Sequence, residues 1–164
     1  MKKLLILTLA ALMMFSLLAC GGNGNEESQP KEIKQLDMKV AYQTLEGAVQ
    51  LPAMLTLDES LMLDYCGISS EKVKQAVVAI CEDSLRTDEI WLLEAVSEDA
   101  AKDLMDAANN RLKKKGEESI TYSPEQYAVV EKAQLIRSGH YVLLIVSPDV
   151  DALTNAAKQA LNIG

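Results

Sequence analysis

The chain has 164 residues, of which 49% are hydrophobic and 24% are charged. It is long enough for one domain with a hydrophobic core and too short for a large multidomain machine. Its formal net charge is -8, with one histidine and 4% aromatic residues. A surface this acidic repels phosphate backbones, which argues against nucleic-acid binding. One imidazole and few aromatic rings also leave little for multi-histidine metal ligation or base stacking.

The start of the chain has the pattern of a bacterial lipoprotein leader. Lys2 and Lys3 form a positively charged start, and an apolar run over residues 4–18 leads into Cys20. Leaders of this kind are cut before a cysteine whose thiol carries diacylglycerol. We therefore expect residues 1–19 to be a lipoprotein signal peptide and Cys20 to be the lipid attachment site. The alternatives are an ordinary secretory leader and an uncleaved membrane anchor, for which the run is short against the roughly 20 residues that span a bilayer.

The predicted organisation after the signal peptide is a tether at residues 20–36 and a single domain at residues 37–164. The tether is polar and rich in glycine, with too few apolar residues to offset the entropy of ordering it. Two or more acyl chains on Cys20 make a durable membrane anchor. The expected location is the extracytoplasmic face of the cell membrane, with the membrane as partner through the lipid anchor.

Two helices are predicted at the start of the domain. Asp37 can cap a helix whose apolar residues fall on one face, and Pro52 stops it. The segment 56–59, Thr-Leu-Asp-Glu, has the pattern of a capping box. It predicts a shorter helix that ends at Gly67.

The sequence next predicts two strands followed by a helix, and a second set of two strands and a helix is predicted further along the chain. A short apolar run at 76–81 and the largely apolar segment 89–96 indicate an antiparallel pair of strands. The helix after Ser97 is predicted to end at Gly116, following three lysines that oppose the negative end of the helix dipole. The second set comprises a short helix opened by a capping box at Ser123, strands at 134–137 and 141–146, and a final helix after 147–149.

An offset of fifty residues aligns the two sets. The identical pairs are Leu93 and Leu143, Val96 and Val146, Ser97 and Ser147, Asp99 and Asp149, and Ala107 and Ala157. We therefore predict an α+β fold in which N-terminal helices precede a duplicated strand-strand-helix unit, giving a four-stranded antiparallel sheet with helices on one face. Shared capping chemistry where a strand meets a helix is the alternative explanation of the matches.

The sequence offers few candidate site residues, and it contains no recognisable catalytic motif, metal site or cofactor motif. His140 lies in a predicted turn, without a motif partner for acid-base chemistry. Cys66 and Cys81 form either a disulfide, as an extracytoplasmic location allows, or two buried free thiols. Trp91 and Tyr141 stand at related places in the two units and mark either an interaction surface on one sheet face or ordinary strand packing.

Three motifs carry a resemblance to a known family. They are Asp88-Glu89-Ile90 before an apolar strand, Tyr-Ser-Pro-Glu-Gln-Tyr at 122–127, and Gly-His-Tyr-Val-Leu-Leu at 139–144. From about Met38 onward the chain resembles domain of unknown function 4358, whose members are typically lipoproteins of Gram-positive anaerobes. The resemblance supports the predicted location and domain limits, and it implies no activity or functional residue.

Two classes of function follow from these observations. The first is a non-catalytic module of the cell envelope that binds a protein, peptide or other envelope component. The second is an extracytoplasmic enzyme or cation-binding protein that uses dispersed carboxylates. The acidic pairs available to it are Asp58-Glu59, Glu82-Asp83 and Glu98-Asp99. A specific partner favours the first class, and a deep acidic cleft that binds metal favours the second.

Overall fold

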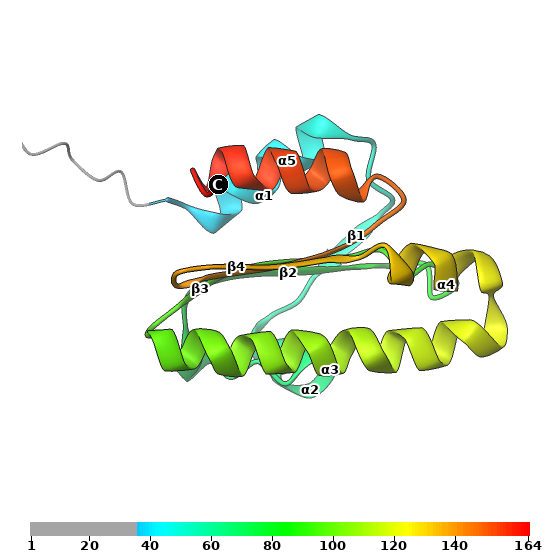
Figure 1. Cartoon of the computed structure of the whole chain (residues 1–164), viewed down its shortest axis with the longest axis horizontal. Helices are drawn as coiled ribbons and strands as arrows, with labels where there is room; N and C mark the ends of the chain where they lie inside the picture. Colours follow the sequence, from blue (N-terminus) through cyan, green and yellow to red (C-terminus); the bar gives the residue numbers. More distant parts are fainter. Residues whose placement is uncertain (1–35) are drawn as a thin grey trace, which may run out of the picture. The chain divides into compact units, whose positions relative to one another are not determined.

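The computed structural model describes residues 36–164, which hold a five-stranded antiparallel sheet between two layers of helices (Figure 1). The predicted signal peptide, Cys20 and all but the last residue of the predicted tether lie outside the described residues. The elements in chain order are α1 (Met38–Ala48), β1 (Met54–Thr56), α2 (Glu59–Cys66), the 3-10 helix η1 (Ser70–Lys72), β2 (Val73–Cys81), β3 (Glu89–Ala95), α3 (Glu98–Tyr122), α4 (Pro124–Glu131), β4 (Gln134–Ser138), β5 (Tyr141–Val146) and α5 (Val150–Ala160).

The sheet has the strand order β1-β2-β3-β5-β4, and every neighbouring pair is antiparallel. Helices α1 and α5 cover one face, and the long helix α3, with α2, lies on the other, whereas α4 lies beyond the end of the strands, beside the last part of α3 (Figure 1). Strands β3 and β5 pair in a register that sets Trp91 opposite Leu144. Because helices lie on both faces of the sheet, these two strands are shielded from water on both sides.

Helices on both faces correct the prediction of a sheet covered on one face. Trp91 and Leu93 belong to the apolar cluster under α3, whereas Ile90 and Leu92 belong to the cluster under α1 and α5. Successive side chains of a strand point to opposite faces, so a strand buried on both sides is apolar at every position. The unbroken apolar run in β3 has this cause.

The fifth strand, β1, was absent from the prediction of four strands. It has three residues and pairs with the end of β2, where Met54 lies opposite Cys81. A strand of this length is too short to show the alternation of apolar and polar residues from which strands are predicted. The predicted capping box is also wrong in detail, because Thr56 lies in β1 and the side chain of Asp58 caps α2 by accepting from the Leu61 backbone N–H.

The structure does not confirm the duplicated unit. Helices α3 and α5 follow the two hairpins but lie on opposite faces of the sheet (Figure 1). Leu93 and Leu143, which match at the fifty-residue offset, accordingly face different apolar clusters. The two helix starts also differ, because the Ser97 hydroxyl caps α3 by accepting from a backbone N–H in its first turn, whereas the Ser147 hydroxyl accepts from the Asp149 N–H before α5 begins.

Local capping signals predicted most helix boundaries. The Asp37 side chain accepts from two backbone N–H groups of α1, and the Ser123 hydroxyl accepts from the Gln126 N–H at the start of α4. Gly67 ends α2 in the left-handed conformation, with φ of 70°. Among residues 36–164, no helix has the length and apolar character needed to cross a bilayer.

Helix α3 contradicts the predicted stop at Gly116. It continues through this glycine to Tyr122, so the three lysines lie within the helix. A β-carbon at Gly116 would lie 3.8 Å from the Tyr127 ring and 3.9 Å from a Val130 methyl group, which is ordinary van der Waals contact.

Replacing Gly116 by Ala is therefore expected to raise the free energy of unfolding by about 0.5–1 kcal/mol, because glycine in a helix interior costs that much relative to alanine. Urea unfolding followed by circular dichroism measures the change. A lower stability for Gly116→Ala would instead support a helix end at this glycine.

Candidate functional site

A cleft of about 800 Å³ opens where the β2–β3 loop faces the second half of α3 and the start of α4. We call it the α3–α4 cleft. Its lining includes four basic side chains, Arg86, Arg111, Lys114 and Lys115, and three acidic ones, Glu82, Asp88 and Glu118. The chain has a net charge of -8, whereas this lining has one more basic than acidic side chain.

A buried ion cluster centred on Glu89 underlies the cleft. Glu89 begins β3 and is fully buried. Arg111 of α3 donates from Nε to Oε1 at 2.9 Å and from Nη2 to Oε2 at 2.8 Å. The Lys115 ammonium, one helical turn further, lies 2.9 Å from Oε2. Trp91, two positions along β3, donates from Nε1 to Oε1 at 2.8 Å.

The cluster holds two cations against one carboxylate. Burial alone would raise the pKa of Glu89, but the hydrogen bonds and charges of Arg111 and Lys115 outweigh it and lower the pKa of this carboxyl. Glu89 therefore stays ionised and fixes both basic side chains, which are only 13% and 11% exposed. The excess positive charge is held in place beside the cleft.

The β2–β3 loop contributes a second buried carboxylate. Asp88 is 2% exposed, and its Oδ2 accepts from Arg86 Nε at 3.0 Å. Its other oxygen, Oδ1, is buried without a hydrogen-bond partner. Thr87 donates its N–H and its hydroxyl to Gln126 Oε1 at 2.9 and 3.0 Å, so the loop is attached to α4.

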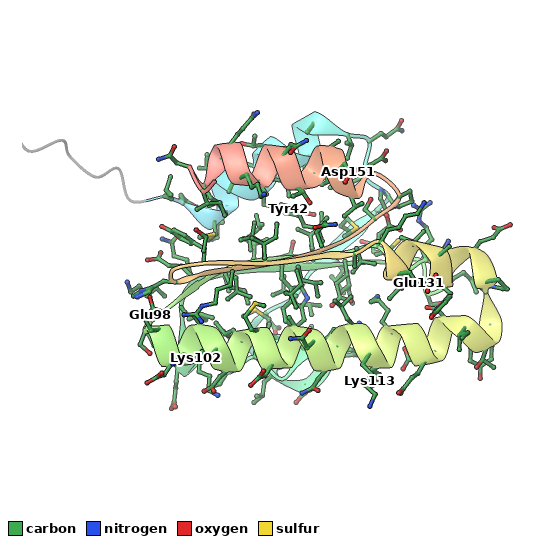
Figure 2. The ribbon with its side chains drawn as sticks, viewed as in Figure 1. Tyr42, Glu98, Lys102, Lys113, Glu131 and Asp151 are labelled. Atoms are coloured by element: carbon green, nitrogen blue, oxygen red, sulfur yellow. The ribbon has the colours of Figure 1, made fainter. Side chains whose placement is uncertain are left out.

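Exposed apolar side chains surround these charges. Leu85 is 80% exposed and Tyr122 is 86% exposed, and both line the cleft together with the partly exposed Leu55 and Tyr65. Large exposed apolar side chains gathered at one concavity indicate a contact surface, whereas scattered ones do not. Lys113, the neighbour of Lys114 on α3, points away from the sheet (Figure 2) and does not line the cleft.

The sequence matches, over residues 47–147, the model of the family described as Domain of unknown function (DUF4358). The chain belongs to this family. The predicted resemblance is thus confirmed at the level of the family. Neither the comparison with curated proteins nor the comparison with solved structures gave a match.

The matched segment of the DUF4358 family contains every residue that lines the α3–α4 cleft. Helix α5 and most of α1 lie outside it. The cleft of this chain is therefore lined entirely by residues of the matched segment.

The predicted aromatic pair does not form a shared surface. Trp91 is fully buried in the cluster under α3, whereas Tyr141 is partly buried against the cluster under α1 and α5. Trp91 pairs with Leu144 in the β3–β5 register. Tyr141 is three positions from Leu144 on β5, so the two rings point to opposite faces of the sheet. Both residues therefore contribute to the packing of their strands, which is one of the two alternatives that the sequence left open.

The acidic pairs that could have served a cation site are separated and partly neutralised. Asp99 pairs with Lys102 at 2.6 Å, and Glu98 pairs with Arg137. His140 lies near the same Glu98 at 3.7 Å, with its side chain 40% exposed. Within residues 36–164, no three His, Cys, Asp or Glu side chains gather as a metal site would need.

Cys66 and Cys81 are both free thiols in the structure. Cys66 is buried, and burial, with a smaller contribution from Glu89, raises its pKa to about 12. Only the thiolate reacts readily with alkylating agents. Cys81 is partly exposed and lines the α3–α4 cleft.

At pH 8 we expect iodoacetamide to label Cys81 well before Cys66 in the folded protein. Peptide mapping by mass spectrometry measures both rates. In urea without a reductant, both residues should be labelled at similar rates. Absence of labelling in urea until a reductant is added would contradict the free thiols.

Proposed function

We propose that the protein is a lipid-anchored, extracytoplasmic module of the cell envelope that binds a ligand in the α3–α4 cleft without transforming it. The leader pattern ending at Cys20 supports the anchor and the location. The cleft supports the binding role, because it joins fixed charges to exposed apolar contacts.

The observation that carries the binding role is the charge arrangement at the cleft. Glu89 holds Arg111 and Lys115 in fixed positions through bonds of 2.8–2.9 Å. Side chains that are already immobilised lose little entropy when a ligand binds. Arginine and tyrosine are also the residue types that contribute most to recognition surfaces. Binding is therefore the role for which these residues are best suited.

The enzyme alternative required acidic side chains to converge in a pocket. The lining of the α3–α4 cleft has four basic and three acidic side chains, and a fourth carboxylate, Glu89, is buried beneath it against Arg111 and Lys115. The basic side chains of α3 are therefore the ones that face the cleft with donors to spare. The buried carboxylate of the lining, Asp88, is joined to Arg86. This composition supports recognition of an anionic group more than hydrolysis or cation binding by carboxylates.

Replacement of Cys20 by Ser tests the anchor. Cells that produce the unaltered chain should incorporate labelled palmitate into it and retain it in the membrane fraction, whereas Cys20→Ser should abolish both. Cys81→Ser serves as the control and should leave labelling unchanged. Equal labelling of the unaltered and Cys20→Ser chains would overturn the proposed anchor.

The binding role is tested with the full chain incubated with envelope extract and washed, followed by identification of retained molecules by mass spectrometry. Lys114→Glu reverses an exposed charge that lines the cleft, and Lys113→Glu reverses the neighbouring charge that does not. We expect a ligand that is retained by the unaltered chain and by Lys113→Glu and is lost from Lys114→Glu. Retention that is the same for all three chains, or no retention, would contradict binding in the cleft.

A further inference from the structure

We infer that the α3–α4 cleft takes a ligand that ends in a carboxylate and carries an N–H donor on the neighbouring carbon. This chemistry belongs to a free amino acid and to the C-terminal residue of a peptide. The inference rests on the proposed binding role and specifies the ligand class.

The carboxylate would lie against the basic side chains of α3. Arg111 bonds Glu89 through Nε and Nη2, so Nη1 is not used in that pair. Lys115 directs one of its three N–H groups at Glu89. Lys114 also lines the cleft and makes no salt bridge within residues 36–164. Together these groups leave donors and positive charge that one carboxylate can satisfy.

The N–H donor would meet Asp88. Its Oδ1 is buried without a partner in a side chain that lines the cleft. A buried acceptor that lacks a hydrogen bond costs about 1–3 kcal/mol, more when it is charged, so a native structure that keeps one needs a reason. The Arg86 side chain, which donates to Oδ2, is 40% exposed, so its displacement would let a ligand N–H reach the Asp88 carboxylate.

The apolar rim selects a ligand with a hydrophobic side chain. Leu85 and Tyr122 are among the most exposed large side chains of the described residues. A terminal leucine would bury its side chain against them. The cleft volume of about 800 Å³ is within the range of sites that enclose small ligands, roughly 300–1,000 Å³. The space suits a terminal residue with one or two residues before it.

Three probes test the inference by calorimetry on the full chain in detergent: N-acetyl-Ala-Ala-Leu, the same peptide with a C-terminal amide, and free leucine. We expect the free-acid peptide to bind at least about tenfold more tightly than its amide, because a charge-assisted hydrogen bond is lost. Lys114→Glu should weaken the acid by about tenfold or more and leave the amide nearly unchanged. Lys113→Glu should affect neither. If free leucine binds with an affinity comparable to that of the free-acid peptide, the ligand is a free amino acid. If the peptide binds and leucine does not, the ligand is the C-terminus of a peptide.

Equal affinity for acid and amide would overturn the inference. If none of the three probes binds, the inference is tested by the chemical structure of the ligand that the chain retains from envelope extract. A retained ligand that depends on Lys114 and has a carboxylate beside an N–H supports the inference. One that depends on Lys114 and lacks this group overturns it and leaves the proposed binding role intact. If the extract also yields no such ligand, the binding role itself fails.

Discussion

Glu89→Gln is expected to lower the free energy of unfolding by about 3–5 kcal/mol, because removing one member of a buried charge cluster leaves the others uncompensated. Glu89 is fully buried, and Arg111 and Lys115 would remain with little access to water. A glutamine keeps the size of the side chain, so loss of charge and not loss of volume causes the effect.

Urea unfolding at pH 7 measures this loss. Glu117→Gln is the matched control, because Glu117 lies on α3, the helix of Arg111 and Lys115, in a loose pair with Lys113. The side chains of Glu117 and Lys113 are 67% and 77% exposed. Exposed pairs of this kind contribute little, and we expect the control to unfold like the unaltered protein. Equal stability of Glu89→Gln and the unaltered protein would contradict the burial of the cluster.

The pH dependence of stability gives an independent result for the same residue. The pKa of Glu89 is lowered from its ordinary value of 4.5. A group whose pKa is lower in the folded state contributes stability above its unfolded pKa and loses this contribution as pH falls through the folded pKa. The difference in unfolding free energy between the unaltered protein and Glu89→Gln should therefore be constant near neutral pH and shrink below about pH 4.5. A difference that stays constant down to pH 2 would contradict the lowered pKa.

Sequence patterns predicted the elements that depend on near neighbours. Asp37 and Ser123 cap their helices through hydrogen bonds to residues two or three positions away, and such contacts are encoded locally. The strands β3 and β5 are predicted from the apolar runs at 90–93 and 141–146. Such runs are also typical of strands buried on both faces, whereas a duplicated strand-strand-helix unit predicts helices on one face only.

The buried cluster was missed because its members are far apart in the chain. Glu89 and Arg111 are 22 residues apart, and no short motif joins them. A usable signal did exist on α3, where the buried positions Leu104 and Ala108 continue at helical spacing to Arg111 and Lys115. Basic residues on the apolar face of a helix require a buried partner. The three lysines were instead interpreted as a helix end, because Gly116 follows them.

Trp91 provides the sharpest contrast between the sequence-based hypothesis and the structure. As part of an interaction surface it would tolerate truncation, whereas in the structure it is fully buried under α3. Trp91→Ala is expected to cost about 3–5 kcal/mol of unfolding free energy through lost burial and the cavity that remains. Tyr122→Ala, at a residue that is 86% exposed, should leave stability nearly unchanged.

The bond from Trp91 Nε1 to Glu89, at 2.8 Å, adds a second expectation. Trp91→Phe keeps a large ring and removes this donor, so we expect a loss of about 1.5–3 kcal/mol, the range for a hydrogen bond to a charged group. In a double-mutant cycle with Glu89→Gln, the two losses should add to more than the loss in the double variant, because Glu89→Gln removes the charge that strengthens the bond and Trp91→Phe removes its donor. Strict additivity would show that the tryptophan contributes by packing alone. A Trp91→Ala protein with unaltered stability would contradict the buried position and restore the surface hypothesis.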